Sequence, residues 1–187
     1  AVDFTIHPEA TLSSTAAFQQ RGNAATHTTF LGGHHSLYGI YLKDLNAHDG
    51  RTWMHITNDA VVVSRNGLFL GHRTYQNSLG QSVGLLDLTC TARMEVTNNV
   101  VLGAGRMGDT YVNLCNEGRI DIRDNASFYS HNNVNFGNTQ CSTGVVTVAG
   151  HGSFSGAVNF YMGMSSNAVG RLVVQDDASV YCGGVLY

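Results

Sequence analysis

One phrase occurs three times in the C-terminal part of the chain, at constant steps of 26 residues. It reads GRIDIRDNASFYS from Gly118, GVVTVAGHGSFSG from Gly144 and GRLVVQDDASVYC from Gly170. Each copy alternates apolar and polar residues, bends at Asn, Asp or Gly, and alternates again, which is typical of two β-strands joined by a tight turn. Repetition at this period is the signature of a solenoid. The sequence therefore predicts a β-solenoid whose successive copies stack as coils.

Related phrases extend the repeat toward the N-terminus. WMHITNDAVVV starts at Trp53 and GLLDLTCTARMEV at Gly84, which lies 34 residues before Gly118, so we expect coils of about 26–34 residues. The extra residues fall in HRTYQNSLGQS and GRMGDTYVNL, and they predict two long loops at one corner, where repeat proteins often bind ligands. We expect residues 51–187 to form the coils of a single domain, behind an N-terminal cap or irregular first coil in residues 1–50.

The alignment of the copies also predicts the core and a disulfide. The positions expected to point inward are aliphatic in every copy, namely Ile120, Val146 and Leu172 in one column and Ile122, Val148 and Val174 in the next. Cys115 and Cys141 occupy equivalent positions on consecutive coils. Stacked strands bring such positions to about 4.8 Å, a separation that a disulfide spans. We predict a Cys115–Cys141 bond. Cys90 and Cys182 do not occupy stacked positions, and the repeat leaves their pairing open.

Composition narrows the function classes. Only 12% of the residues are charged and the net charge is −3, so there is no basic surface of the kind that binds nucleic acid. The apolar runs are too short to span a membrane. The even number of cysteines and a first residue other than Met predict an exported protein, extracellular or on the cell surface, whose signal peptide has been removed. No catalytic constellation or cofactor motif is found, and His34 and His35 with His48 or Asp49 lack a fixed metal-ligand spacing.

The spaced pattern of the copies, Gly-x-Φ-x-Φ followed by Asn/Asp-x-Ala-x-Φ as in GRIDIRDNASF and GRLVVQDDASV, resembles a known architecture. It is similar to the right-handed parallel β-helix of bacterial autotransporter passengers and related surface repeat proteins. The resemblance covers residues 51–187 and is specific for architecture. It implies an all-β, right-handed parallel β-helix at a secreted or surface location, commonly with a role in adhesion or scaffolding, and it implies no catalytic residue.

The last copy of the phrase predicts self-association. It reaches its second strand and stops near Tyr187, with no closing Gly and no polar cap. An open β-helix end leaves backbone groups unpaired over an apolar core and templates association, so we expect head-to-tail filaments; a fragment of a longer passenger is the alternative. The expected interface residues are Val173, Val174, Val180, Tyr181, Val185, Leu186 and Tyr187.

A second hypothesis is a β-helix that binds or cleaves polysaccharide, like a lyase, a hydrolase or a phage tailspike. It rests on Asp87 and Asp121, which stack on the outer face and could flank a glycosidic bond. Arg93, Arg119 and Arg123 lie close enough in sequence to neutralise this pair. Outward tyrosines are further candidate contacts for a surface glycan or a host protein. Tyr129 and Tyr181 are expected in one column, with Tyr161 near it.

Overall fold

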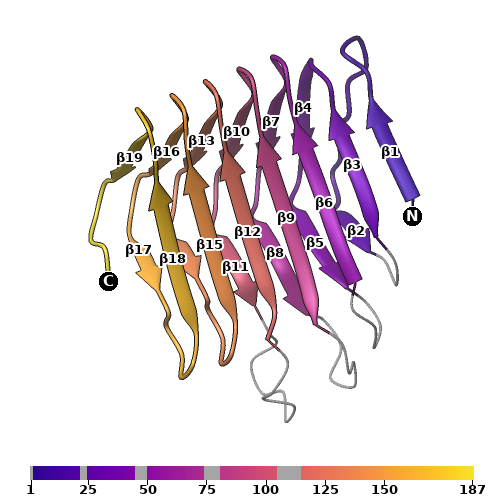
Figure 1. The fold of residues 1–187 in the computed structure, drawn as a ribbon. Coiled ribbons are helices and arrows are strands. Elements are labelled where there is room, and N and C mark those ends of the chain that lie inside the picture. The colour runs from indigo at the N-terminus through magenta and orange to yellow at the C-terminus, as the bar shows by residue number, and fades with distance from the viewer. Residues whose placement is uncertain (1, 22–24, 45–49, 74–80, 105–114) are drawn as a thin grey trace.

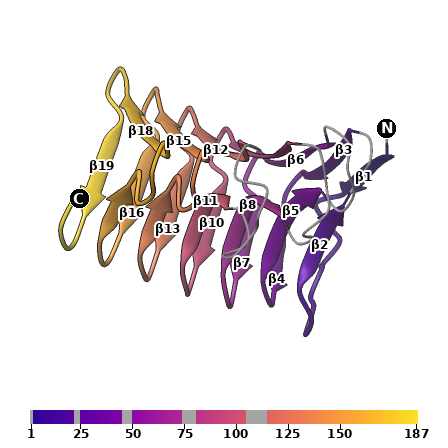
Figure 2. The same ribbon diagram turned by 90° about the horizontal axis from the view of Figure 1, so that it is seen from below.

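A computed structural model describes residues 2–21, 25–44, 50–73, 81–104 and 115–187. Within these residues the chain forms strands β1 to β19 and no helix, and every pairing between strands is parallel. The strands form three sheets, and successive coils lie side by side along the molecule with the two termini at opposite ends (Figure 1). Seen from below, the complete coils each pass once through each sheet, whereas the first and the last coil have only an isolated bridge in one of them (Figure 2). The predicted all-β, parallel solenoid architecture is confirmed.

The three sheets follow the order of the coils. Sheet A contains β1 (Val2–Ile6), β3 (Thr26–Phe30), β6 (Gly50–Ile56), β9 (Ser82–Leu88), β12 (Glu117–Ile122), β15 (Thr143–Val148) and β18 (Val169–Val174). Sheet B contains β4 (His34–Leu37), β7 (Val61–Ser64), β10 (Arg93–Val96), β13 (Ser127–Ser130), β16 (Ser153–Gly156) and β19 (Ser179–Cys182). Sheet C contains β2 (Phe18–Arg21), β5 (Ile40–Asp44), β8 (Leu68–Arg73), β11 (Val100–Ala104), β14 (Val134–Phe136) and β17 (Phe160–Met162).

The N-terminal region takes part in all three sheets. The stretch expected to form a cap or an irregular first coil supplies β1 to β5, which pair in parallel with the strands that follow them. Its irregularity is local, because the register between β5 and β8 shifts at Leu42 and Lys43. The sequence repeat is weak here because three of the core positions are polar, namely Gln20, Thr26 and Thr28.

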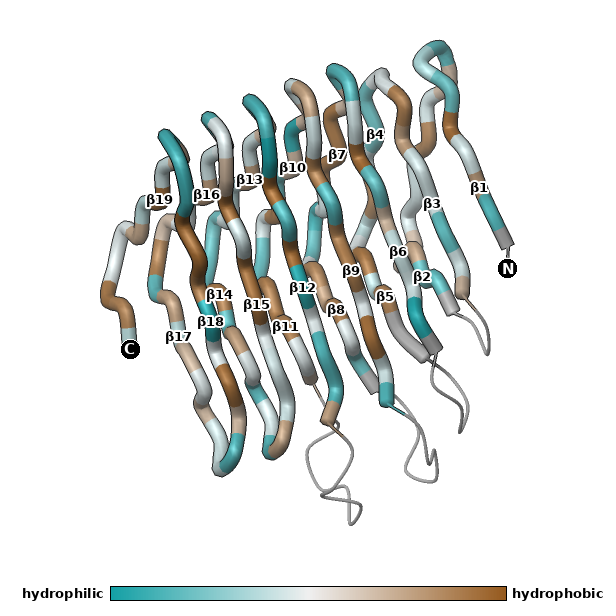
Figure 3. Tube along the Cα trace, viewed as in Figure 1, coloured by the Kyte–Doolittle hydropathy of each residue, from teal (hydrophilic) through white to brown (hydrophobic). Residues whose placement is uncertain are grey.

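Alternation along each strand builds the core. Ile120 pairs with Leu86 on one side and Val146 on the other, and Val146 pairs with Leu172, as the repeat predicted. Inward positions are buried while their neighbours on the same strand remain half-buried. Hydrophobic residues recur along the strands of every coil (Figure 3). Burial of these aliphatic columns, at roughly 25 cal/mol per Å² of apolar surface, is the main stabilising contribution.

Two corners are fixed by residues that repeat from coil to coil. At the corner after sheet A, one residue has φ between 56° and 65° in each of the five turns that follow β6, β9, β12, β15 and β18: Asn58, Cys90, Asp124, Gly150 and Asp176. Gly, Asn and Asp tolerate this left-handed conformation better than other residues, so Cys90 is the exception. At the corner after sheet B, Asn132 donates a side-chain hydrogen bond to Asn98, and Asn98 donates one to Asn66. This asparagine ladder links three coils and was not predicted.

Two further observations concern the C-terminal coils. Cys115 and Cys141 form the predicted disulfide, with their Cα atoms 4.8 Å apart. The expectation that the last copy stops after its second strand is wrong. The chain continues along sheet C, where Leu186 pairs with Phe160, and Phe160 N–H donates to the Val185 carbonyl. The last coil therefore has three sides, because the residues after β19 pair with β17 without forming a regular strand.

Candidate functional site

The outer face of sheet A carries a polar column across three adjacent strands. His55 on β6 pairs with Asp87 on β9, and Asp87 pairs with Asp121 on β12. These residues are brought together by parallel stacking alone, because they are 32 and 34 residues apart in sequence. The predicted stacking of Asp87 and Asp121 is confirmed, whereas His55 was missed.

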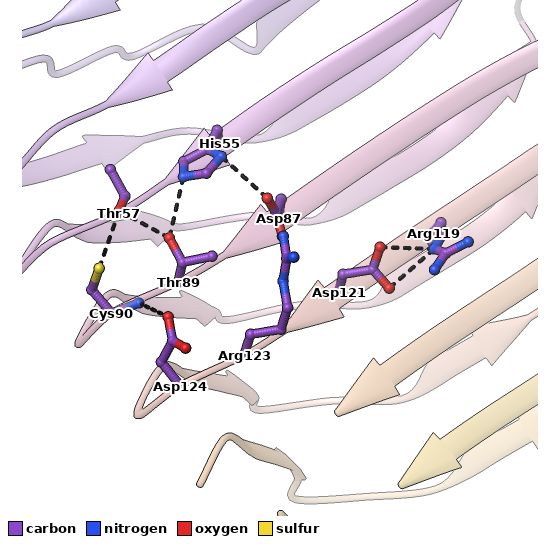
Figure 4. Close-up of polar contacts among 9 residues, drawn as sticks. All are labelled: His55, Thr57, Asp87, Thr89, Cys90, Arg119, Asp121, Arg123 and Asp124. Atoms are coloured by element: carbon purple, nitrogen blue, oxygen red, sulfur yellow. Dashed lines mark hydrogen bonds and ion pairs between the residues drawn. The ribbon is translucent and has the colours of Figure 1, made fainter. Parts of the chain in front are cut away.

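Asp87 is held by two basic side chains (Figure 4). Its Oδ2 lies 3.1 Å from His55 Nδ1, and its Oδ1 accepts a 2.6 Å hydrogen bond from Arg123 Nη2. Partial burial acts to raise the pKa of this carboxyl group, but the hydrogen bonds and positive charges of His55 and Arg123 outweigh it, and the pKa lies below its usual value. The same pairing raises the pKa of Arg123. Asp87 is therefore suited to remain ionised rather than to act as a general acid.

Asp121 forms a separate ion pair on its own strand. Arg119 Nε donates to both of its oxygens, at 3.0 and 2.8 Å. Arg119 and Arg123 neutralise the two carboxylates as the sequence suggested, whereas Arg93 lies on β10 in sheet B. The two aspartates thus belong to two ion pairs rather than to one paired carboxylate site.

A chain of hydroxyl groups connects His55 to Cys90 at the nearby corner (Figure 4). His55 Nε2 lies 3.2 Å from Thr89 Oγ1, Thr89 donates to Thr57 Oγ1 at 2.9 Å, and Thr57 donates to Cys90 Sγ at 3.6 Å. The Cys90 thiol is exposed and forms no disulfide. The hydrogen bonds from Thr57 and from the Asn58 backbone lower its pKa. This arrangement favours the thiolate of Cys90.

We expect this thiolate to be measurable by alkylation. In a Cys182→Ser background, the rate of reaction with iodoacetamide should follow a titration whose midpoint lies below the ordinary thiol value of about 8.5. Thr57→Val removes the first hydrogen bond and should move the midpoint to higher pH. Mass spectrometry of the alkylated Cys90 peptide across pH gives both curves. Equal midpoints in the two proteins would show that Thr57 does not act on the thiol.

The outward tyrosines occupy two other sheets. Tyr129 and Tyr181 share one column on sheet B, separated by Ser155, as predicted. Tyr161 is not near them, because it lies on β17 in sheet C and its ring stacks on Tyr187 with centroids 4.9 Å apart. The five candidate glycan contacts, Asp87, Asp121, Tyr129, Tyr161 and Tyr181, are therefore distributed over three sheets and do not form one site.

The expected assembly residues surround the C-terminal end of the stack. Five of them are exposed, namely Val174, Tyr181, Val185, Leu186 and Tyr187, and the other two, Val173 and Val180, are half-buried. The inward-facing side chain of Val174 is 47% exposed, although its column neighbour Val148 is fully buried. At the opposite end, Phe4 on β1 is 50% exposed. Both ends of the stack therefore present apolar side chains of the core.

The remaining candidates from the sequence are the possible metal ligands and the two long loops. His34 is exposed, and His35 is buried between the Leu12 N–H and the Gly32 carbonyl, so the two imidazoles point to opposite faces. His48 and Asp49 lie outside the described residues, as do most of the two long loops, 74–80 and 105–114. In the described part of the chain, no group of three or more His, Cys, Asp or Glu residues is arranged to hold a metal ion.

Within the same described residues, no helix is long and apolar enough to cross a membrane. Comparison with known proteins finds no protein-family model, no curated protein and no solved structure that matches this chain.

Proposed function

We propose that this protein is a non-enzymatic structural β-solenoid, a scaffold or adhesin subunit whose copies associate head to tail into filaments. In this proposal the coils are right-handed, in keeping with the strong preference of parallel crossovers. The observation that carries the proposal is the exposure of core side chains at both terminal coils, with Val174 at one end and Phe4 at the other. A second copy of the chain is the occupant we propose for each end.

The core residues at the two ends belong to the same columns of stacked residues. This favours a second copy of the chain as the occupant of each end. The column of Phe4 in β1 continues through sheet A to Leu172 in β18. The column of Phe18 in β2 continues through sheet C to Leu186. A molecule placed on the C-terminal coil would therefore meet an aliphatic or aromatic residue in each of these columns, and its β1 would extend sheet A beyond β18. Such a contact is heterologous and propagates as a filament.

Two further observations agree with this proposal. The Cys115–Cys141 disulfide suits an oxidising compartment, which is consistent with a secreted or cell-surface location. Cleavage of glycosidic bonds typically needs one carboxyl group with a raised pKa, and Asp87 has a lowered one. The ion pairs on sheet A thus favour a structural role over a polysaccharide-cleaving one.

The test uses two variants that each block one end. Leu186→Asp places a charge in the C-terminal coil, and Phe4→Asp places one in the N-terminal coil. Wild-type protein should form filaments whose length grows with concentration, whereas each variant alone should be monomeric, because a filament needs both ends. An equimolar mixture of the two variants should give a discrete dimer through the remaining pair of intact ends. Analytical ultracentrifugation and negative-stain microscopy measure these states.

Tyr129→Asp is the matched control, since it adds the same charge to an exposed position on the side of the stack. It should leave filament formation unchanged. Wild-type protein that stays monomeric at all concentrations, or a mixture of the end variants that gives no dimer, contradicts the proposal.

A further inference from the structure

A hollow lies on the outer face of sheet A above β9, on the opposite side of β9 from the core. Three successive residues of one outward column are Trp53 on β6, Leu85 on β9 and Arg119 on β12. The neighbouring column repeats the arrangement with Arg51, Val83 and Glu117, listed from β6 to β12. In both columns a short aliphatic side chain stands between two long ones. The side chains of β6 and β12 thus form two walls, and β9 forms an apolar floor.

The size of this hollow suits one small ring. Its walls stand on strands two steps apart, and are therefore separated by ~10 Å between backbones. The cavity has a volume of about 380 Å³ and is lined along β9 from Val83 to Asp87. This volume is within the range of sites that bind small molecules, although at its lower end. The hollow can therefore hold one sugar-sized ring.

Trp53 presents an open aromatic face to the hollow. Its indole ring stacks on His27 of β3, with ring centroids 4.5 Å apart and an angle of 19° between the planes. Because β3 and β9 flank β6 on opposite sides, His27 covers the indole face that points away from the hollow. The other face points over Leu85. An aromatic face above an aliphatic floor is a surface on which the C–H groups of a ring can pack.

The polar side chains that line the hollow include equal numbers of basic and acidic residues. The cavity is lined by three arginines, Arg51, Arg119 and Arg123, and by three acids, Asp87, Glu117 and Asp121. Formal charge is therefore balanced, which favours a neutral ligand over an anion or a cation. The side chains of Arg51 and Glu117 and the Nη atoms of Arg119 make no hydrogen bond or ion pair with other described residues. Guanidinium donors beside a carboxylate acceptor match hydroxyl groups, which both donate and accept.

We propose that this hollow binds a pyranose unit of a neutral polysaccharide, with the ring between Trp53 and Arg119. Leu85 forms the floor, and Glu117 and Arg51 bind ring hydroxyls at the open side. The site does not depend on filament formation, because Arg51, Trp53, Leu85, Glu117 and Arg119 lie on β6, β9 and β12, away from both ends of the stack.

Trp53 is the only tryptophan in the chain, so its fluorescence reports on the hollow directly. We expect a saturable change in this fluorescence on titration with at least one of four neutral hexasaccharides, built of glucose, mannose, galactose or xylose. A hexasaccharide of galacturonic acid provides the acidic comparison and should bind more weakly than the best neutral sugar. Leu85→Phe fills the floor and should weaken binding at least about tenfold, and Glu117→Gln should also weaken it without changing the shape of the hollow.

Val145→Phe is the control, because Val145 follows Arg119 in the same column but lies outside the lining. It should bind as wild type does, and thermal unfolding followed by circular dichroism confirms that each variant is folded. The proposal is overturned if none of the neutral sugars gives a saturable signal, or if the acidic sugar binds best. It is also overturned if folded Leu85→Phe and Glu117→Gln both bind like wild type.

Discussion

Ile122→Asp should unfold the central coils of the solenoid. The Ile122 side chain is fully buried and is paired between Leu88 and Val148, so the new carboxylate would have neither water nor a partner. Loss of the apolar side chain together with burial of an unpaired polar group should cost about 5 kcal/mol or more. This is comparable to the total stability of many single domains. Urea denaturation followed by circular dichroism measures the loss.

Thr147→Asp is the matched control for this substitution. Thr147 lies on the adjacent strand and points outward, in the column of Asp121. The same new charge there remains in contact with solvent, so we expect a change within about 1 kcal/mol. A similar loss of stability in both variants would mean that burial of the new charge is not the cause. A stable Ile122→Asp protein would mean that the column of Ile122 is not the core.

Gly118→Ala should strongly destabilise the solenoid. A Cβ atom at this position would lie 2.5 Å from Gly103 N, 2.6 Å from the Leu70 carbonyl oxygen and 2.7 Å from Leu102 Cα. All three are backbone atoms of sheet C, so no side-chain rotation relieves the contact. We expect a loss of about 3 kcal/mol or more, because sheet A must move away from sheet C at this corner. The midpoint of thermal unfolding measures the loss.

Gly150→Asn tests whether a glycine is needed only where neighbouring backbone atoms approach closely, as at Gly118, and not merely where φ is positive. Gly150 has a φ of 65°, but Asp124 and Asp176 adopt nearly the same conformation at the same corner. Asparagine tolerates this region of backbone space, and the nearest atom to a new Cβ lies at 3.1 Å. We therefore expect a loss of no more than about 1 kcal/mol. A larger loss at Gly150 than at Gly118 would contradict the assignment.

Much of the fold could be predicted from the sequence because its main determinant is periodic. Equal steps between Ile120, Val146 and Leu172 fix which residues stack, and stacking in turn fixes the core and the Cys115–Cys141 disulfide. The N-terminal coils were harder to predict because their core includes Gln20, Thr26 and Thr28, which interrupt the aliphatic pattern. These polar residues occupy inward positions, so the alternation of apolar residues that marks a buried strand is lost there.

The sites were harder to predict because they depend on contacts across coils of unequal length. Trp53, Leu85 and Arg119 form one column only once steps of 32 and 34 residues are known, and no single stretch of sequence contains them. Asn66, Asn98 and Asn132 recur with the same two steps, which was the available signal for their ladder. Tyr161 was misplaced because the bend between β16 and β17 puts it on sheet C.

At the corner between sheets C and A, the number of residues in the connection can change without changing the register of the strands that follow. β12 pairs with β9 after a step of 34 residues and with β15 after a step of 26, and it keeps six partners in each case. The cost of closing a longer loop grows slowly, by about 0.6 kcal/mol for each doubling of its length. This corner should therefore accept grafted peptides, such as an epitope or a binding loop, without disturbing the coils beneath them. Copies of such a graft on successive coils would form a row with the spacing of the strands, about 4.8 Å.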